Sequence, residues 1–262
     1  MTQFRTLPPF GGDQRAVAEV VRGIMDGKTN NVGSITLATG NATTTTLYNE
    51  RIGYDSLIFF VPISAAAYAD SAPYGSFTRN TSQTAPLANT PAAIEYDTTE
   101  ESNGIYLSNS SRLNVRNAGV YNLQFSIQLA SDDNALQYAE VWFRKNGSDI
   151  VRSSSKIDLP IRKSAGNPSH VIATVNIFVN LAANDYIEVA GLVSATTVTL
   201  EAYAATASPA VPAVPAAIVT MQYISPLAST NIYVSSRQPG QATISHFSNN
   251  TADKTYGYII VG

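Results

Sequence analysis

Two pairs of adjacent carboxylates, Asp132-Asp133 and Glu100-Glu101, are the residues of this chain best placed to do chemistry. Two hard oxygen ligands side by side can begin a calcium site in a loop. Calcium is bound by about six to eight oxygens, however, and a pair supplies only part of that set. Solvated loop charges are therefore the simpler interpretation of both pairs, and calcium binding by Asp132 and Asp133 stays an open alternative.

Other catalytic constellations are sparse. The chain has no cysteine and only two histidines, His170 and His246, which lie far apart in the sequence. This composition leaves no thiolate site and little room for a histidine-built metal centre. No Gly-x-Ser-x-Gly elbow places a nucleophile either. We expect no enzymatic activity, metal or cofactor, and we expect each histidine to be a packed or edge residue of a strand.

Charge and composition narrow the class of protein. The 262 residues carry a net charge of −3 with 13% charged residues, and the cations form no basic stripe, which argues against nucleic-acid binding. The amino-terminal segment lacks the apolar core of a signal peptide, and the longest strongly apolar run, 57–61, is too short to span a bilayer. We therefore expect a protein made in a cytoplasm, without membrane insertion.

The amino terminus predicts an arm followed by one helix. Residues 1–12 contain Pro-Pro and Gly-Gly pairs and should be extended, free to lie on a neighbouring subunit. Asp13 is typical of a helix N-cap. Four aliphatic residues then follow at the spacing of one helical stripe, and we predict a helix over 14–26. The stripe consists of Val17, Val20, Val21 and Ile24.

Most of the remaining chain predicts strands. Residues 117–130 alternate strictly between apolar and polar side chains, as in a strand with one buried face. The continuous apolar run 57–61 predicts a strand covered on both faces. The Asn146-Gly147 dipeptide predicts a hairpin turn. Abundant Thr, Ser, Asn, Val, Ile and Tyr agree with an all-β fold. Further strands are expected at 104–107, 112–115, 139–144, 171–180, 185–190, 196–202, 217–224, 231–235, 242–247 and 256–261.

Domain boundaries fall where the alternation is lost. Between Ser64 and Asn103 the sequence is rich in small residues, Asn and Pro, and we expect a linker there. The Pro-rich tract 209–215 predicts a polyproline-like loop. The first and last blocks are each too short to form a core alone, so we expect 13–75 and 229–262 to form one discontinuous domain with 76–228 inserted into it.

The middle region resembles the C1q/TNF-like jelly roll. The resemblance spans about residues 90–226 and is carried by the order and spacing of four segments. The flanking blocks, 15–33 and 243–262, resemble small proteins of tailed-phage structural gene clusters. The four segments are Ala118-Gly-Val-Tyr-Asn-Leu-Gln-Phe125, Val141-Trp-Phe-Arg-Lys-Asn-Gly147, Asn184-Asp-Tyr-Ile-Glu-Val189 and Ala217-Ile-Val-Thr-Met-Gln-Tyr-Ile224.

The C1q/TNF-like resemblance implies a ten-strand sandwich that assembles as a trimer, with aromatic and aliphatic side chains along the three-fold axis. It does not imply an enzyme. The absence of a collagen stalk, a signal peptide and cysteines departs from the secreted animal members and suits a virion protein made in a bacterial cytoplasm. Ordinary core packing is the other explanation for the aromatic residues. The candidates for the trimer interface are Tyr106, Tyr121, Tyr138, Phe143, Tyr186 and Tyr223.

Two structural roles in a tailed phage fit these features. In the first, the chain is a trimeric capsid decoration, or cement, protein that binds the major capsid protein through its terminal domain and projects the jelly roll outward. In the second, it is a tail fibre, spike or tail-tip protein whose jelly roll binds a host-surface glycan or protein. The candidates for anchoring to the virion are Phe4, Phe10, Val17, Val20, Val21 and Ile24.

Overall fold

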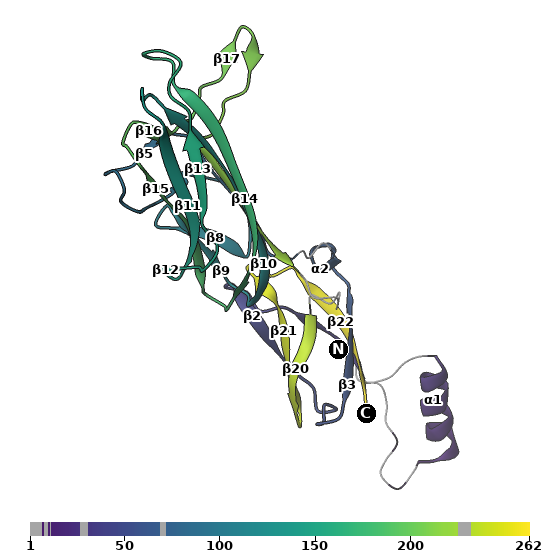
Figure 1. Ribbon diagram of the computed structural model, residues 1–262. Coiled ribbons are helices and arrows are strands. Elements are labelled where there is room, and N and C mark those ends of the chain that lie inside the picture. The colour runs from purple at the N-terminus through teal and green to yellow at the C-terminus, as the bar shows by residue number, and fades with distance from the viewer. Residues whose placement is uncertain (1–6, 8–9, 11, 27–30, 69–71, 225–231) are drawn as a thin grey trace. The chain divides into compact units, whose positions relative to one another are not determined.

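A computed structural model describes the chain except for residues 1–6, 8–9, 11, 27–30, 69–71 and 225–231. The fold is predominantly β, which confirms the all-β prediction (Figure 1). The chain divides into a terminal unit, Met1–Asp70 with Thr230–Gly262, and an inserted unit, Ser71–Ser229. The sequence placed the insertion at 76–228.

The terminal unit contains two three-stranded antiparallel sheets and two helices among its described residues. The strand order is β1-β22-β3 in one sheet and β2-β21-β20 in the other. The strands are β1 (Val32–Thr36), β22 (Thr255–Val261), β3 (Leu57–Pro62), β2 (Ala42–Tyr48), β21 (Gln241–Asn249) and β20 (Ile232–Gln238). The helices are α1 (Gln14–Met25) and the short α2 (Ala65–Tyr68).

Apolar residues at every second position form the core of the terminal unit. Leu37, Leu47, Ile244 and Ile260 are buried from both sheets, whereas their sequence neighbours face outward. Chain segments more than 190 residues apart meet here, because β2 pairs with β21 and β1 pairs with β22. Both ends of the sequence are therefore needed to complete this core.

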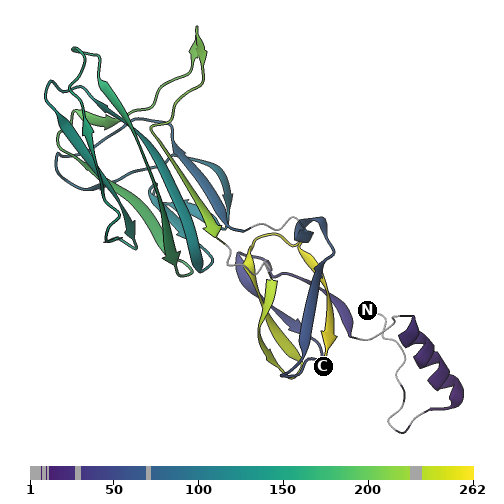
Figure 2. The same cartoon turned by 45° about the vertical axis from the view of Figure 1, so that its right-hand side comes forward.

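The inserted unit is a sandwich of two antiparallel sheets, which the second view also shows as two layers (Figure 2). Its first sheet has the order β5-β16-β10-β19-β4-β7, and β14 pairs with β10 along the other edge. The strands are β4 (Tyr74–Arg79), β5 (Gln83–Thr84), β7 (Thr98–Asn103), β10 (Gly119–Ser131), β14 (Ser169–Leu181), β16 (Val198–Leu200) and β19 (Ala217–Ile224).

The second sheet has the order β12-β11-β15-β9-β8, with β13 paired to β11 and β6 paired to β15. Its strands are β6 (Ala92–Ala93), β8 (Ile105–Ser108), β9 (Arg112–Val115), β11 (Gln137–Lys145), β12 (Ser148–Asp149), β13 (Ser155–Leu159) and β15 (Tyr186–Val193). A separate short hairpin, β17 (Thr206–Ala207) with β18 (Ala210–Val211), projects from the sandwich (Figure 2).

The strand at the centre of the first sheet has the predicted pattern. The odd-numbered residues of β10 from Tyr121 to Leu129 are buried, and Asn122, Gln124, Ser126 and Gln128 point to the other face. The core between the sheets includes the edge-to-face pair Phe125 and Phe143, whose ring centroids are 5.4 Å apart. Interdigitation of the two buried faces is what holds this sandwich together.

Three sequence predictions need correction. The run 57–61 forms β3, but Leu57, Phe59 and Val61 are exposed, so among the described residues nothing covers its second face. The expected linker 64–103 contains β4 and β7, which belong to the first sheet of the sandwich. The Pro-rich tract contributes Ala210–Val211 to the short hairpin, so it is not wholly a polyproline-like loop.

Candidate interaction surfaces

The two pairs of adjacent carboxylates have structural partners. Glu100-Glu101 lies in β7, where Glu100 accepts a hydrogen bond from the Thr78 hydroxyl at 2.7 Å. Asp133 accepts hydrogen bonds from the backbone N–H of Ala135 and the hydroxyl of Thr197, both at 2.9 Å. These two bonds hold the pKa of Asp133 below its ordinary value. Arg162 lies 3.4 Å from Asp132. Among the described residues no group of three or more acidic or histidine side chains is gathered as a metal site would need.

The two histidines lie in different units. His246, on β21, is buried, with Nε2 2.8 Å from the Thr45 hydroxyl and Nδ1 2.7 Å from the Phe247 carbonyl. His170, at the start of β14, is exposed and lies 3.1 Å from the hydroxyl of Tyr203, which donates a hydrogen bond to Glu201. Burial and the neighbouring Glu201 raise the pKa of Tyr203 to about 12, so this hydroxyl stays protonated near neutral pH.

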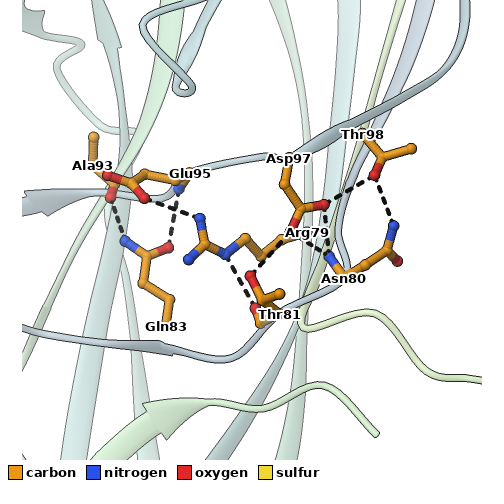
Figure 3. A network of polar contacts seen from close by, with 8 residues as sticks. All are labelled: Arg79, Asn80, Thr81, Gln83, Ala93, Glu95, Asp97 and Thr98. Carbon is orange, nitrogen blue, oxygen red and sulfur yellow. Dashed lines mark hydrogen bonds and ion pairs between the residues drawn. The ribbon is translucent and has the colours of Figure 1, made fainter. Parts of the chain in front are cut away.

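A network of polar side chains fixes the segment between β4 and β7 (Figure 3). Its centre is Asp97, which accepts bonds from the Asn80 backbone N–H at 3.0 Å and the Thr81 hydroxyl at 3.0 Å. Burial alone would raise the pKa of Asp97, but these bonds and one from Thr98 outweigh it, and the pKa lies below its ordinary value. The network keeps that carboxylate ionised as a structural acceptor.

The same network joins the two sheets. Arg79 makes an ion pair with Glu95 at 2.9 Å. The Gln83 amide donates to the Ala93 carbonyl and accepts from the Glu95 N–H (Figure 3). Because β5 pairs with the first sheet and β6 with the second, these bonds bridge the sandwich. The adjacent recess is lined by aliphatic residues, with Gln83 as its one polar side chain, and holds no group suited to catalysis.

The outward face of the second sheet is ionic. We define the ionic face by the outward residues of β8, β9, β11, β13 and β15. Glu188, only 8% exposed, accepts bonds from Ser111 at 2.9 Å and Arg112 at 3.1 Å. Asp149 accepts from the Trp142 indole at 2.6 Å and from Arg144 at 2.8 Å. Glu188, Arg112, Asp149 and Arg144 are therefore already paired within one chain.

The six candidates for the trimer interface divide between the core and the ionic face. Tyr121 and Phe143 are fully buried inside the sandwich, and Tyr223 packs edge-to-face on Tyr121 at 5.3 Å. Neither of the two buried rings offers surface to a partner. The other three lie on the ionic face, each ring covered by a cation of its own chain: Tyr106 by Arg116, Tyr138 by Lys156 and Tyr186 by Arg112.

The outward face of the first sheet has the opposite character. We define the uncharged face by the outward residues of β14, β10 and β19: at these positions there is no Asp, Glu, Lys or Arg. The aromatic ring of Phe178 is 69% exposed and Ile172 is 63% exposed. Val120, Ile218 and Ile224 add apolar area, and most of the remaining outward positions carry amides and hydroxyls, with His170 at the start of β14. Its outward positions include Ile172, Thr174, Asn176, Phe178, Asn122, Gln124, Ser126, Gln128, Ile218, Thr220, Gln222 and Ile224.

The sequence indicates this face by a row of uncharged residues, which the aromatic candidates did not include. Alternate positions of 122–128 and of 172–180 are all uncharged, which can be read once each strand is recognised. That β10 lies between β14 and β19 could not be read from spacing. Only the pairing turns three short uncharged rows into one continuous surface.

A second exposed apolar surface belongs to the terminal unit. We define the apolar sheet face by the outward residues of β1, β22 and β3, none of them charged. Phe59 is 58% exposed. The sheet's other face is buried in the core. Its exposed residues are Val32, Leu57, Phe59, Val61, Ile63, Ile259 and Val261.

Helix α1 carries the predicted stripe and cap. The Asp13 side chain accepts a hydrogen bond from the Ala16 N–H at 2.6 Å, which confirms the N-cap. Val17, Val21 and Ile24 are exposed, and Ala16 is the only residue of the helix that is buried. Phe10 is fully exposed, and Phe4 lies outside the described residues. No described helix is long and apolar enough to cross a membrane.

Comparisons with known proteins identify no family for this chain. A scan against models of known protein families and a search of curated proteins both found no match.

Proposed function

We propose that this chain is a non-enzymatic structural protein of a tailed-phage virion, a homotrimer with a C1q/TNF-like jelly roll, whose place is the capsid surface. In this role the terminal unit binds the particle, and the inserted unit faces outward as a stabilising cap. The phage assignment rests on the resemblance of the flanking sequence blocks. The physical properties of the inserted unit support the structural role.

The strand order of the inserted unit supports the jelly-roll part of the proposal. Successive long strands alternate between the sheets, since β9, β11 and β15 lie in one and β10, β14 and β19 in the other. A jelly roll has connections that cross between its sheets in this manner, whereas a simple meander keeps neighbours in one sheet. The short strands β4 and β7 then extend the first sheet beyond β19.

The uncharged face is the observation that carries self-association. Protein interfaces lose charged residues at their centres, because a buried charge must be desolvated and paired. An outward sheet face without a single ionic side chain over three strands has that composition. Phe178 and Ile172 supply apolar contact area, and the surrounding amides can bond across an interface. We therefore assign the trimer contact to this face, in place of the six aromatic candidates.

Among the described residues, the groups that could do chemistry have structural partners, which is consistent with the proposed structural role. The carboxylates described above are hydrogen-bonded to loops or paired with cations. Both histidines have hydrogen-bonding neighbours. What the described surface offers instead is area for binding other proteins.

Two measurements test this proposal. Native mass spectrometry of the purified chain should give a mass three times that of the 27.9 kDa monomer. Quantitative mass spectrometry of purified virions should then count this chain against the major capsid protein. Hundreds of copies per particle support the decoration role, and a few to a few tens move the protein to the tail, where host-surface binding is the alternative. Absence from the virion, or a monomer in solution, overturns the proposal.

A further inference from the structure

The terminal unit contains two apolar surfaces that its described residues leave without cover. One is the stripe of α1, and the other is the apolar sheet face of β1, β22 and β3. The second sheet of the same unit does not share this property. Its outward residues include Thr44, Thr46 and Ser245, so it is suited to water.

The sheet face is a smooth apolar platform. Gly257 lies at the middle of the central strand, opposite Val61, and carries no side chain. Val61 and Ile63 lean over it, because a Cβ placed there would lie 3.2 Å and 3.3 Å from their methyl groups. Leu57 and Phe59 continue the platform along the edge strand. Its polar side chains are Ser34 on β1 and, at one end, Thr36 and Thr255, whose hydroxyls lie 2.9 Å apart.

Helix α1 needs a surface of this kind. It has 12 residues, and isolated helices below about 12–15 residues are marginal in water. Three valines and one isoleucine in the stripe, together with Gly23, lower its intrinsic helix propensity further. A helix of this length is about 18 Å long, and a seven-residue strand such as β22 is about 23 Å long. The stripe and the platform therefore match in length and in chemistry.

We propose that the apolar sheet face binds helix α1 of a second copy of this chain. Within one copy the helix buries only Ala16 while the platform stays exposed, so a single chain leaves both surfaces without a partner. When each copy donates its helix to the next, a closed ring covers every platform and every stripe. This exchange assigns Val17, Val21 and Ile24 to a neighbouring copy rather than to the virion, and it does not depend on the proposed virion role.

Helix α1 of the same chain is the alternative ligand for the apolar sheet face. Six residues, 26–31, connect α1 to β1, and an extended segment of that length spans at most about 20 Å. This reach is enough for a helix to fold onto its own sheet. The experiment must therefore distinguish a helix donated by another copy from a helix that closes on its own.

Disulfide trapping separates these cases, and the natural absence of cysteine removes any background. One full-length preparation carries Val21→Cys and the other carries Val61→Cys. The two are mixed, allowed to exchange subunits and oxidised gently, and peptide mass spectrometry then looks for a disulfide that joins the two substituted positions. The matched controls replace Val21→Cys by Arg22→Cys, on the polar side of the helix, or Val61→Cys by Thr46→Cys, on the other sheet.

We expect the Val21→Cys and Val61→Cys mixture to give at least about tenfold more mixed disulfide than either control pair. A mixed yield no higher than in the controls overturns the proposal. A chain carrying both substitutions tests the alternative ligand: a disulfide that forms only within that chain, with none in the mixture, also overturns the proposal.

Hydrogen exchange of the unmodified chain gives a second readout that needs no substitution. In the assembled protein the backbone N–H groups of α1 should be protected, and Phe59→Asp should remove that protection without affecting β10. Exchange of α1 at the rate of an unstructured peptide in the assembled wild-type protein contradicts the proposal. Circular dichroism of each variant checks that the sheets remain folded.

Discussion

The inserted unit presents two outward sheet faces that differ in charge. On the ionic face, Glu188, Arg112 and Arg144 are paired inside the chain, and three tyrosines are covered by cations. On the uncharged face there is neither an ion pair nor an Asp, Glu, Lys or Arg side chain along the outward positions of β14, β10 and β19. The difference suggests that one face is built for water and the other for a protein partner.

The comparison also gives the reason why our proposal sets the aromatic candidates aside. Tyr106, Tyr138 and Tyr186 are large and partly exposed, yet each already has a cation above its ring. Their polar and apolar parts are satisfied within the chain. Phe178 has no such cover, and its neighbours across β10 are amides and hydroxyls.

The largest effect should come from a charge placed at the centre of the uncharged face. Phe178→Lys puts an ammonium group where the proposed interface has no acidic partner, so assembly should weaken by at least about 100-fold. Sedimentation across a concentration series measures the loss of trimer, in a chain that also carries Phe59→Asp so that exchange of α1 does not hold the copies together. Asp158→Lys, on the ionic face, is the matched control and should assemble normally. An unchanged trimer in Phe178→Lys would mean that the partner surface lies elsewhere.

The next effect concerns the least exposed charge of the ionic face. Glu188→Ala removes the acceptor for Ser111 and Arg112, and we expect unfolding to become easier by about 2 kcal/mol. Urea denaturation measures this loss, and the trimer should persist at native conditions. Should Glu188→Ala dissociate the trimer while the monomer keeps its stability, the division of roles between the two faces would be reversed.

A smaller effect should depend on pH. Hydrogen bonds from Lys145 and Asn146 lower the pKa of Asp185 from 3.8 to about 2. Because the folded pKa lies below the unfolded one, this contribution is complete above about pH 4 and is lost as the pH falls through about 2. Asp185→Asn should cost about 1 kcal/mol at neutral pH after solvent screening, and that difference should vanish near pH 2. Thermal unfolding at several pH values tests this, and a difference that persists at pH 2 contradicts the assignment.

The smallest effect is expected at an exposed pair. Lys156 lies 3.6 Å from Glu140 and 3.9 Å from the ring centroid of Tyr138. Lys156→Ala should change stability by less than about 1 kcal/mol, because solvated pairs contribute little. The same denaturation assay measures it, and its oligomeric state should match the wild type. A loss as large as that of Glu188→Ala would show that the ionic face is more than a solvated surface.

Local patterns in the sequence were sufficient to predict the elements with strong periodicity. The alternation of 117–130 corresponds to β10, and the cap at Asp13 marks the start of α1. The Asn146-Gly147 turn joins β11 to β12, with both residues at positive φ. Each of these signals lies within about a dozen residues, where backbone geometry and burial of one face decide the outcome.

Predictions that needed distant partners were less successful. The strands β4 and β7 were missed because they are short and lie among Pro, Asn and Ser residues, where the pairing with β19 decides their structure. The run 57–61 was expected to be covered on both faces, because a continuous apolar strand is usually buried by other elements of its own chain. Here it marks a surface whose cover, by our proposal, comes from another copy. The spacing of residues along one strand does not predict which strands pair, and the pairing decides which sheet faces are covered.

The way the inserted unit joins the chain has an evolutionary consequence. Its first strand β4 and last strand β19 are antiparallel neighbours, and the Tyr223 N–H donates to the Pro73 carbonyl at 2.8 Å. The chain therefore enters and leaves the inserted unit at neighbouring positions. Recombination could replace the inserted unit by any domain whose two ends lie equally close together, while the terminal unit kept its own core.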